Sequence, residues 1–198
     1  RGVALLSSTH DHFMNDEYFD KAIEFGNLYR ALKKSCRNVR WKDSVVGYEA
    51  NGLKNTYHLR QDLLKGKYRI SPYQHFTVYE PKKREIVATR LRDRQFQKAL
   101  CMAGLYDDMV EHLIHDNGAS LKGKGISFTR RRFEQHLRWH YARYGKAGYV
   151  LKIDFRKYFD NIRHDVLLQE IARRVADKTV LDTIQKVLAA NEHDVEYV

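Results

Sequence analysis

Proline and cysteine are scarce in this sequence of 198 residues. Only two prolines, Pro72 and Pro81, interrupt the chain, which favours long helices. The two cysteines, Cys36 and Cys101, form no Cys-x-x-Cys pair. This excludes a cysteine zinc site and a disulfide framework, and it fits the reducing cytosol, so we expect a cytoplasmic protein.

Long apolar runs are also missing. No stretch approaches the ~20 apolar residues that a membrane-spanning helix needs, and the mean hydropathy is −0.65. The opening residues are too short an apolar run for a good signal peptide. No segment combines a strongly apolar helical face with a lysine-rich one, which argues against a membrane-surface protein. We therefore expect no membrane partner.

Acidic residues are too few to balance the basic ones. The chain has 36 Lys and Arg against 25 Asp and Glu, a formal net charge of +11. Such an excess favours a polyanionic partner, with nucleic acid first and an anionic membrane second. The hydrophobic content of 43% is enough for a packed core of one domain or two small ones.

Hydrophobic periodicity predicts helices on both sides of a β-hairpin and one buried strand, and hence an α+β fold. The hairpin has a basic tip, and a polar loop over 117–125 precedes a basic, aromatic helix. A further strand would begin at 195–198. The expected helices cover 15–37, 53–66, 93–114, 130–144, 165–175 and 179–190, and the expected strands cover 74–80, 85–89 and 149–155.

The segment 149–155 reads as a buried strand that ends in Asp154. A carboxylate mounted at the end of a rigid strand is a good ligand for a divalent metal. Nucleotidyl transfer needs two metals about 3.5–4 Å apart, so further carboxylates would have to come from elsewhere. The alternative is a strand-end aspartate that caps the next turn.

The residues around Asp154 resemble a known motif. The string Asp154-Phe-x-Lys-Tyr-Phe159-Asp-x-Ile162 resembles the first catalytic-aspartate motif of reverse transcriptases of bacterial and phage retroelements. Two upstream strings resemble the fingers hairpin and the following helix of these enzymes, closest to the diversity-generating and group II intron types. They are Val78-Tyr-Glu-Pro-Lys82-Lys-Arg84-Glu-Ile-Val and Arg92-Asp93-Arg94-x-x-Gln97-x-Ala-Leu100.

The resemblance covers roughly residues 15–190 and implies a right-hand polymerase fold. Residues 1–70 would form an N-terminal helical region, 71–148 the fingers with the hairpin and basic helix, and 149–198 the start of a palm that is cut short. The segment 120–125 stands where these enzymes have their second fingers motif, but it lacks the arginine-rich pattern of the intron enzymes.

The resemblance also implies roles for single residues. Asp154 and the backbone carbonyl of Phe155 would bind Mg²⁺ or Mn²⁺, and the ring of Phe159 would exclude a ribose 2′-hydroxyl. The triphosphate would meet the backbone amides of Lys157 and Tyr158 and the cations Lys82 and Arg84, although a solvated hairpin tip also explains the two cations. The residues expected to bind nucleic acid are Arg94, Gln97, Lys122, Lys124, Arg130 and Arg131.

One element of the family pattern is missing. These enzymes complete their metal site with a Tyr-x-Asp-Asp turn downstream of the first aspartate, and this sequence has none there. Its single Asp-Asp pair, Asp107 and Asp108, lies upstream in an expected helix, where the carboxylates would face solvent or a lysine. We therefore expect the 198-residue chain alone to be inactive as a polymerase.

Several residue groups leave their interpretation open. Two histidine pairs at helical spacing, 112/115 and 136/140, lack the pattern of a zinc site. Residues 130–144 mix cations with rings, as a single-strand-binding surface does, but Phe133, Leu137, Tyr141 and Tyr144 would also suit a core-facing stripe. Asp93 and Arg94 could be a helix-start pair or could position a template.

Two functions remain. The first is an RNA-directed DNA polymerase that uses an RNA template, a primer strand and deoxynucleoside triphosphates, with an accessory protein or structured RNA as a further partner. The second is a non-catalytic RNA-binding module, maturase-like or a split subunit, that keeps the polymerase fold. A downstream Tyr-x-Asp-Asp in the full gene would favour the first.

Overall fold

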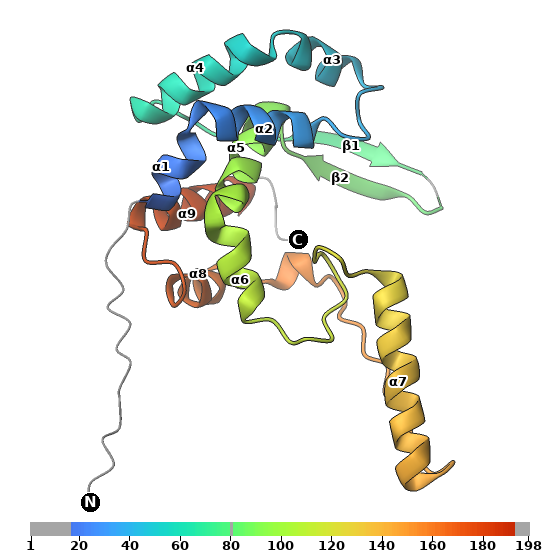
Figure 1. Cartoon of the computed structure of the whole chain (residues 1–198). Helices are drawn as coiled ribbons and strands as arrows, with labels where there is room; N and C mark the ends of the chain where they lie inside the picture. Colours follow the sequence, from blue (N-terminus) through green and yellow to red (C-terminus); the bar gives the residue numbers. More distant parts are fainter. Residues whose placement is uncertain (1–16, 80, 193–198) are drawn as a thin grey trace, which may run out of the picture.

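A computed structural model describes residues 17–79 and 81–192 of the chain, and in these ranges it is mostly helical with one two-stranded hairpin (Figure 1). The expected strand at 195–198 lies outside the described residues. The elements are α1 (Glu17–Ile23), α2 (Phe25–Ser35), α3 (Asp43–Ala50), α4 (Gly52–Leu64), β1 (Gln74–Val78), β2 (Arg84–Ala88), α5 (Leu91–Leu100), a wide helical turn (Cys101–Leu105), α6 (Tyr106–Glu111), α7 (Ile126–Tyr144), a 3₁₀ turn (Phe159–Asn161), α8 (His164–Ala172) and α9 (Lys178–Glu192).

Most of the expected helices are present, with breaks that the periodicity did not show. The helix expected over 15–37 is divided into α1 and α2 at Glu24, whose backbone is extended. The buried side chain of Asn27 donates hydrogen bonds to the carbonyls of Ala22 and Ala99, at 3.3 and 3.1 Å. It thereby satisfies the end of α1 and fixes the break against α5.

The helix expected over 93–114 also changes direction. Gly104, with φ of 145°, lies in the wide turn between α5 and α6. A side chain at this position would collide with the ring of Tyr18, so only glycine fits the backbone and the contact. α3 was not expected from the sequence, although Asp43 in its first turn is a typical helix-start residue.

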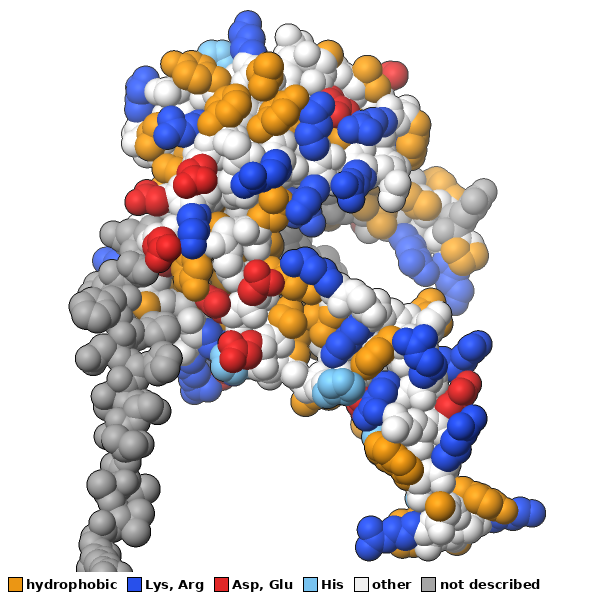
Figure 2. Space-filling view, viewed as in Figure 1, with side chains coloured by type: hydrophobic (Ala, Val, Ile, Leu, Met, Phe, Trp, Pro, Cys, Tyr) orange, Lys and Arg blue, Asp and Glu red, His pale blue; other side chains and the backbone are white. Residues whose placement is uncertain are grey.

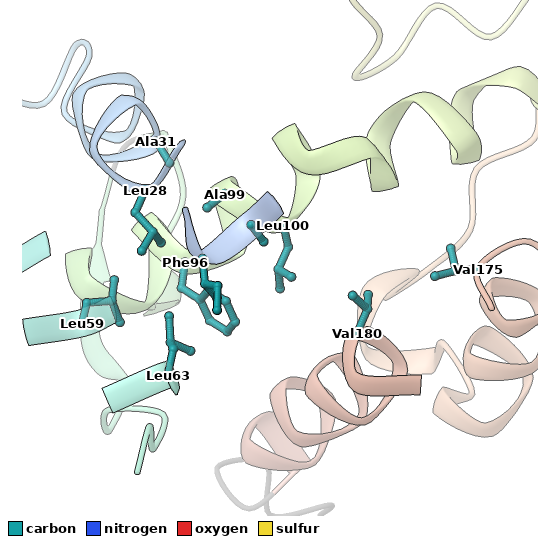
Figure 3. Close-up of a cluster of buried hydrophobic side chains, with 11 residues drawn as sticks. Leu28, Ala31, Leu59, Leu63, Phe96, Ala99, Leu100, Val175 and Val180 are labelled. Carbon is teal, nitrogen blue, oxygen red and sulfur yellow. The ribbon is translucent and has the colours of Figure 1, made fainter. Parts of the chain in front are cut away.

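The main core surrounds Phe96 on α5. Its side chain is 1% exposed and meets the rings of Tyr68 and Phe19 edge to face, with centroids 5.0 and 6.3 Å away. Leucines from α2 and α4, including Leu28 and Leu59, pack around the same ring (Figure 3). α2 and α4 therefore pack together around a side chain of α5.

A buried polar residue joins the same elements. The amide nitrogen of Gln95, which is fully buried, donates to the carbonyl of Leu28 at 3.1 Å and to the hydroxyl of Thr56 at 2.9 Å. Its amide oxygen accepts a hydrogen bond from the hydroxyl of Tyr48 at 3.1 Å. One side chain on α5 thus ties down α2, α3 and α4, because its buried amide must have partners.

A buried acid, Asp177, attaches the segment between α8 and α9 to α1. One carboxylate oxygen of Asp177 accepts the backbone N–H of Val180 at 2.9 Å and caps the start of α9. The other oxygen accepts the backbone N–H of Phe19 on α1 at 3.0 Å. Val175 and Val180 extend the core toward these helices (Figure 3).

The strand expected over 149–155 is not formed. This segment has no regular secondary structure, and Tyr149, Leu151 and Ile153 are 104%, 82% and 66% exposed. The prediction of a buried strand was wrong for the described chain. The reason is that a strand needs a neighbour to pair with, and the one sheet in the described residues is the hairpin β1–β2.

The core-facing stripe considered for residues 130–144 is also not found. α7 is a helix, as expected, but it projects from the body of the molecule (Figure 1). Phe133, Leu137, Tyr141 and Tyr144 are between 43% and 60% exposed, so none of them is buried in the core. No helix in the described part of the chain is long and apolar enough to cross a membrane.

We predict that Phe96→Ala lowers the free energy of unfolding by about 3–5 kcal/mol, because it removes a large ring from the centre of the core. Leu53→Ala, at a position that is 60% exposed on α4, is the matched control and should cost less than about 0.5 kcal/mol. Urea unfolding followed by circular dichroism measures both. Equal losses in the two variants would contradict this account of the core.

Candidate nucleic-acid interface

The hairpin presents two of the predicted phosphate ligands to solvent. β1 and β2 are antiparallel, with Phe76 opposite Ile86 and Val78 opposite Arg84. Lys82, in the connection, and Arg84, at the start of β2, are both exposed. Within the described residues neither cation is ion-paired, so both charges are available to an anionic ligand.

Two neighbouring residues of α5 hold the ends of this hairpin. The carboxylate of Asp93, which is fully buried, accepts the hydroxyl of Tyr68 at 2.7 Å and the backbone N–H of Ser71 at 3.2 Å. The guanidinium of Arg94 donates to the carbonyl of Thr89 at 3.2 Å. We call these three contacts the hairpin clamp, because they fix the chain before β1 and after β2.

The clamp bears on the alternatives that the sequence left open. Asp93 has a structural role, since its carboxylate is buried and its acceptors are used within the chain. Burial and the hydrogen bond to Asp93 raise the pKa of Tyr68, so its hydroxyl stays protonated as a donor. Arg94 has one contact to the hairpin, and the side-chain nitrogen of Gln97 is buried without a partner in the described chain. As nucleic-acid ligands, both remain predictions.

A loop held by charged hydrogen bonds lies beside the hairpin, between α2 and α3. Glu49 on α3 accepts two hydrogen bonds from Arg40 at 2.9 Å and one from Lys33 at 3.1 Å. These charged donors lower the pKa of Glu49 to about 2. The ammonium of Lys42 at the end of this loop lies 5.9 Å from the ring centroid of Phe76 and joins the loop to β1.

The segment that resembles the catalytic-aspartate motif forms an exposed turn. Lys157 has φ of 49°, and its carbonyl accepts hydrogen bonds from the backbone and the side chain of Asn161, at 3.1 and 2.8 Å. The rings of Tyr158 and Phe159 pack edge to face 5.3 Å apart, and Phe159 is 80% exposed. Asn161 was not singled out in the sequence, yet its short polar side chain closes this turn.

Asp154 and Phe155 precede this turn and are also exposed. Among the described residues no group of three or more acidic, histidine or cysteine side chains could hold a metal ion. Asp154 therefore offers one carboxylate of the hard type that Mg²⁺ or Mn²⁺ prefers. The described residues do not by themselves fit a two-metal site.

The upstream acid pair, Asp107 and Asp108, lies in the first turn of α6 and contacts other parts of the chain. Asp108 accepts a hydrogen bond from the hydroxyl of Tyr18 at 2.5 Å, which raises the pKa of Tyr18 to about 12 together with partial burial. Asp107 lies 3.7 Å from the ammonium of Lys122. Asp107 therefore faces a lysine, as the sequence predicted, but the prediction was wrong for Asp108, which is hydrogen-bonded to α1.

Four predicted nucleic-acid ligands lie around the start of α7. Lys122 and Lys124 contact the chain, through Asp107 and through the carbonyl of His115 at 2.6 Å. Arg130 lies 3.5 Å from Glu134 on the same helix, whereas Arg131 lines a shallow pocket of about 390 Å³ together with Lys124. These residues form one basic region, although two of the cations already have acidic neighbours.

A carboxylate holds α7 to the preceding loop. Asp116 accepts hydrogen bonds from Arg132 and His136 on α7, both at 2.5 Å, and from His115 at 3.0 Å. These donors, Arg132 first, hold the pKa of Asp116 far below its ordinary value. In Figure 2 an open, concave space separates the hairpin from α7, with Lys and Arg side chains along both of its edges.

Comparison with known proteins finds two distant relatives. The chain is 26% identical over 169 residues to a protein named for intron 1 of COX1/OXI3 in Saccharomyces cerevisiae, which covers 84% of this chain and 19% of that protein. It is 28% identical over 142 residues to the protein YkfC of Escherichia coli, which covers 69% of this chain and 36% of YkfC. No family model matches the chain.

The chain spans about a fifth of the length of the yeast relative and about a third of the length of YkfC. The similarity to the yeast protein extends over most of the range in which the sequence motifs occur. The chain is therefore distantly similar to this yeast protein over a range that includes the hairpin, α5, Asp154 and the turn that follows Asp154.

We predict that Glu49 makes stability depend on pH. Its pKa is lowered from 4.5 to about 2 on folding, so its contribution is fully present above about pH 5 and is lost as the pH falls from 4.5 toward 2. The gap in unfolding free energy between the native protein and Glu49→Gln should therefore shrink in acid. Urea unfolding over the range from about pH 6 to about pH 3 measures this gap.

The control for this measurement is Glu111→Gln, at an exposed acid on α6. It should behave like the native protein at each pH, because Glu111 has no ion pair within the described residues. A gap for Glu49→Gln that stays constant across the pH range would show that the contacts with Arg40 and Lys33 do not stabilise the folded state.

Proposed function

We propose that the chain is the fingers and the start of the palm of a retroelement reverse transcriptase, an RNA-directed DNA polymerase. Residues 1–70 are the N-terminal helical region, 71–148 the fingers and 149–198 the beginning of the palm. The observation that carries this proposal is the clamped hairpin, because it presents cations with no ion pair among the described residues at the position where the resemblance puts phosphate ligands. The similarity to an intron-named protein supports it.

The proposed reaction is attack of a primer 3′-hydroxyl on the α-phosphate of a deoxynucleoside triphosphate, directed by an RNA template. Lys82 and Arg84 offset the charge of the triphosphate, for which the guanidinium fork is well suited. The turn held by Asn161 presents Lys157, Tyr158 and Phe159 to the nucleotide, and the ring of Phe159 excludes a 2′-hydroxyl. Arg94, Gln97, Lys122, Lys124, Arg130 and Arg131 are the proposed contacts to template and primer.

Asp154 is the proposed metal-binding and catalytic carboxylate, with the carbonyl of Phe155 beside it. Mg²⁺ or Mn²⁺ would supply charge stabilisation at the reacting phosphate. Because no group of three or more possible metal ligands occurs among the described residues, the complete site requires further carboxylates, and the 198-residue chain alone is expected to be inactive.

The same observation favours a second candidate function, a non-catalytic RNA-binding module. A chain with a net charge of +11 and no complete metal site among its described residues would bind RNA without extending a primer. The two functions differ in whether Asp154 matters for anything besides local structure.

We predict that the full-length gene product extends a primer on an RNA template with Mg²⁺ and deoxynucleotides, and that Asp154→Asn lowers the extension rate by about 100-fold or more. Asparagine keeps the size of the side chain but loses the charge that a metal needs. RNA affinity should change little. Gel analysis of extended products and a filter-binding assay measure the two quantities.

Asp107→Asn is the matched control, since it removes a carboxylate that faces Lys122 and lies in α6. It should keep nearly full extension. A native protein that binds RNA in a salt-dependent way but never extends a primer would establish the RNA-binding module instead. Equal extension by the native protein and Asp154→Asn would remove Asp154 from the catalytic site.

A further inference from the structure

The loop between α2 and α3 holds a tryptophan in a fixed, solvent-facing position. The indole N–H of Trp41 donates to the carbonyl of Asn38 at 3.2 Å, while 77% of the residue is exposed. Asn38 has φ of 62°, a left-handed conformation that asparagine tolerates better than most residues. The ring is therefore displayed by the loop and is not part of the core.

The rest of the loop is built to be rigid. Val39 packs against the smaller core cluster of Leu32, Cys36 and Val45. The backbone N–H of Lys42 donates to the carbonyl of Val39 at 3.1 Å, which closes a turn around Trp41. Together with the contacts of Arg40 to Glu49, these interactions fix the loop before any ligand arrives, and a fixed ring loses little entropy on binding.

Trp41 begins a strip of rings and cations that reaches the hairpin. The ammonium of Lys42 lies 5.1 Å from the ring centroid of Trp41 and 5.9 Å from that of Phe76 on β1. Phe76 and Val78 share one face of β1, since alternate residues of a strand point the same way. Arg84 pairs with Val78 and so lies on this face too.

This combination fits single-stranded nucleic acid better than a protein partner. Exposed rings stack on unpaired bases, and nearby cations contact the phosphates between them. Phe76 and Val78 are 45% and 38% exposed, so the strip is open along β1. Glu49 on α3 is already paired with Arg40 and Lys33. Its carboxylate therefore does not neutralise the positive charge of Lys42.

We propose that Trp41 is a stacking platform for an unpaired base of single-stranded RNA, with Lys42 holding the adjacent phosphate. This deepens the proposed function and rests on it, since it makes the strip from Trp41 to Val78 the path of the unpaired template, which leads to the nucleotide at Arg84. Duplex nucleic acid does not use the platform, because its bases are already stacked on one another.

Intrinsic fluorescence tests this directly, because the chain has two tryptophans, Trp41 and Trp139. Trp139→Phe leaves Trp41 as the only indole. We expect a short unstructured single-stranded RNA to quench its emission to saturation, and the matching RNA duplex to leave it nearly unchanged. Unchanged emission in saturating single-stranded RNA overturns the proposal. A loss of emission that follows the protein concentration and does not depend on added RNA also overturns it.

Affinity provides the second readout. Trp41→Ala should weaken binding of single-stranded RNA by about 5- to 100-fold, the loss of one stacked base, while Trp41→Phe keeps most of the affinity. Tyr57→Ala, at an exposed ring on α4 outside the strip, is the matched control and should bind like the native chain. Equal affinity of Trp41→Ala and the native chain overturns the proposal. Circular dichroism shows that each variant is folded.

The outcome separates this proposal from the polymerase proposal. If Trp41 is quenched by single-stranded RNA but the full-length gene product never extends a primer, the stacking platform stands and the polymerase proposal fails. If a primer is extended while Trp41 shows no quenching and no effect on affinity, the polymerase proposal stands and the stacking platform fails.

Discussion

The buried carboxylate of Asp93 is the interaction on which the candidate site depends. An isolated two-stranded hairpin is marginally stable in water, and this one has little core of its own, since Phe76 and Val78 are partly exposed. Asp93 holds the chain before β1 through Tyr68 and Ser71, and Arg94 holds the chain after β2. Phe96 and Gln95 anchor α5 in the core. Because α5 holds both ends of the hairpin, it also fixes the position of the hairpin cations.

Local sequence patterns predicted much of this fold. They failed where contacts between segments far apart in the sequence determine the structure. The hairpin and the C-terminal helices follow from alternation and helical periodicity, which act over a few residues. The break at Glu24 depends on a contact between Asn27 and α5, far away in the sequence. The strand expected at 149–155 needs a pairing partner that the described residues do not provide, and no local pattern could reveal that.

The site divides in the same way. Motif spacing singled out Lys82, Arg84 and Asp154, and the structure leaves all three exposed to a ligand. Motif spacing did not single out Trp41, which is exposed and held in place by its loop. Nor did it single out Glu49, whose hydrogen bonds come from separate segments of the chain. A tryptophan next to a lysine is a weak signal in a sequence, because only burial distinguishes a core ring from a displayed one.

The central claim is that the hairpin tip and the Asp154 turn act on one nucleotide. Cross-linking with a photoreactive deoxynucleoside triphosphate, on the full-length gene product bound to an RNA template and primer, tests it most directly. The account predicts labelled peptides from both the 82–84 and the 157–159 segments, competed away by the natural nucleotide. Label on only one of these segments, or on neither, would contradict it.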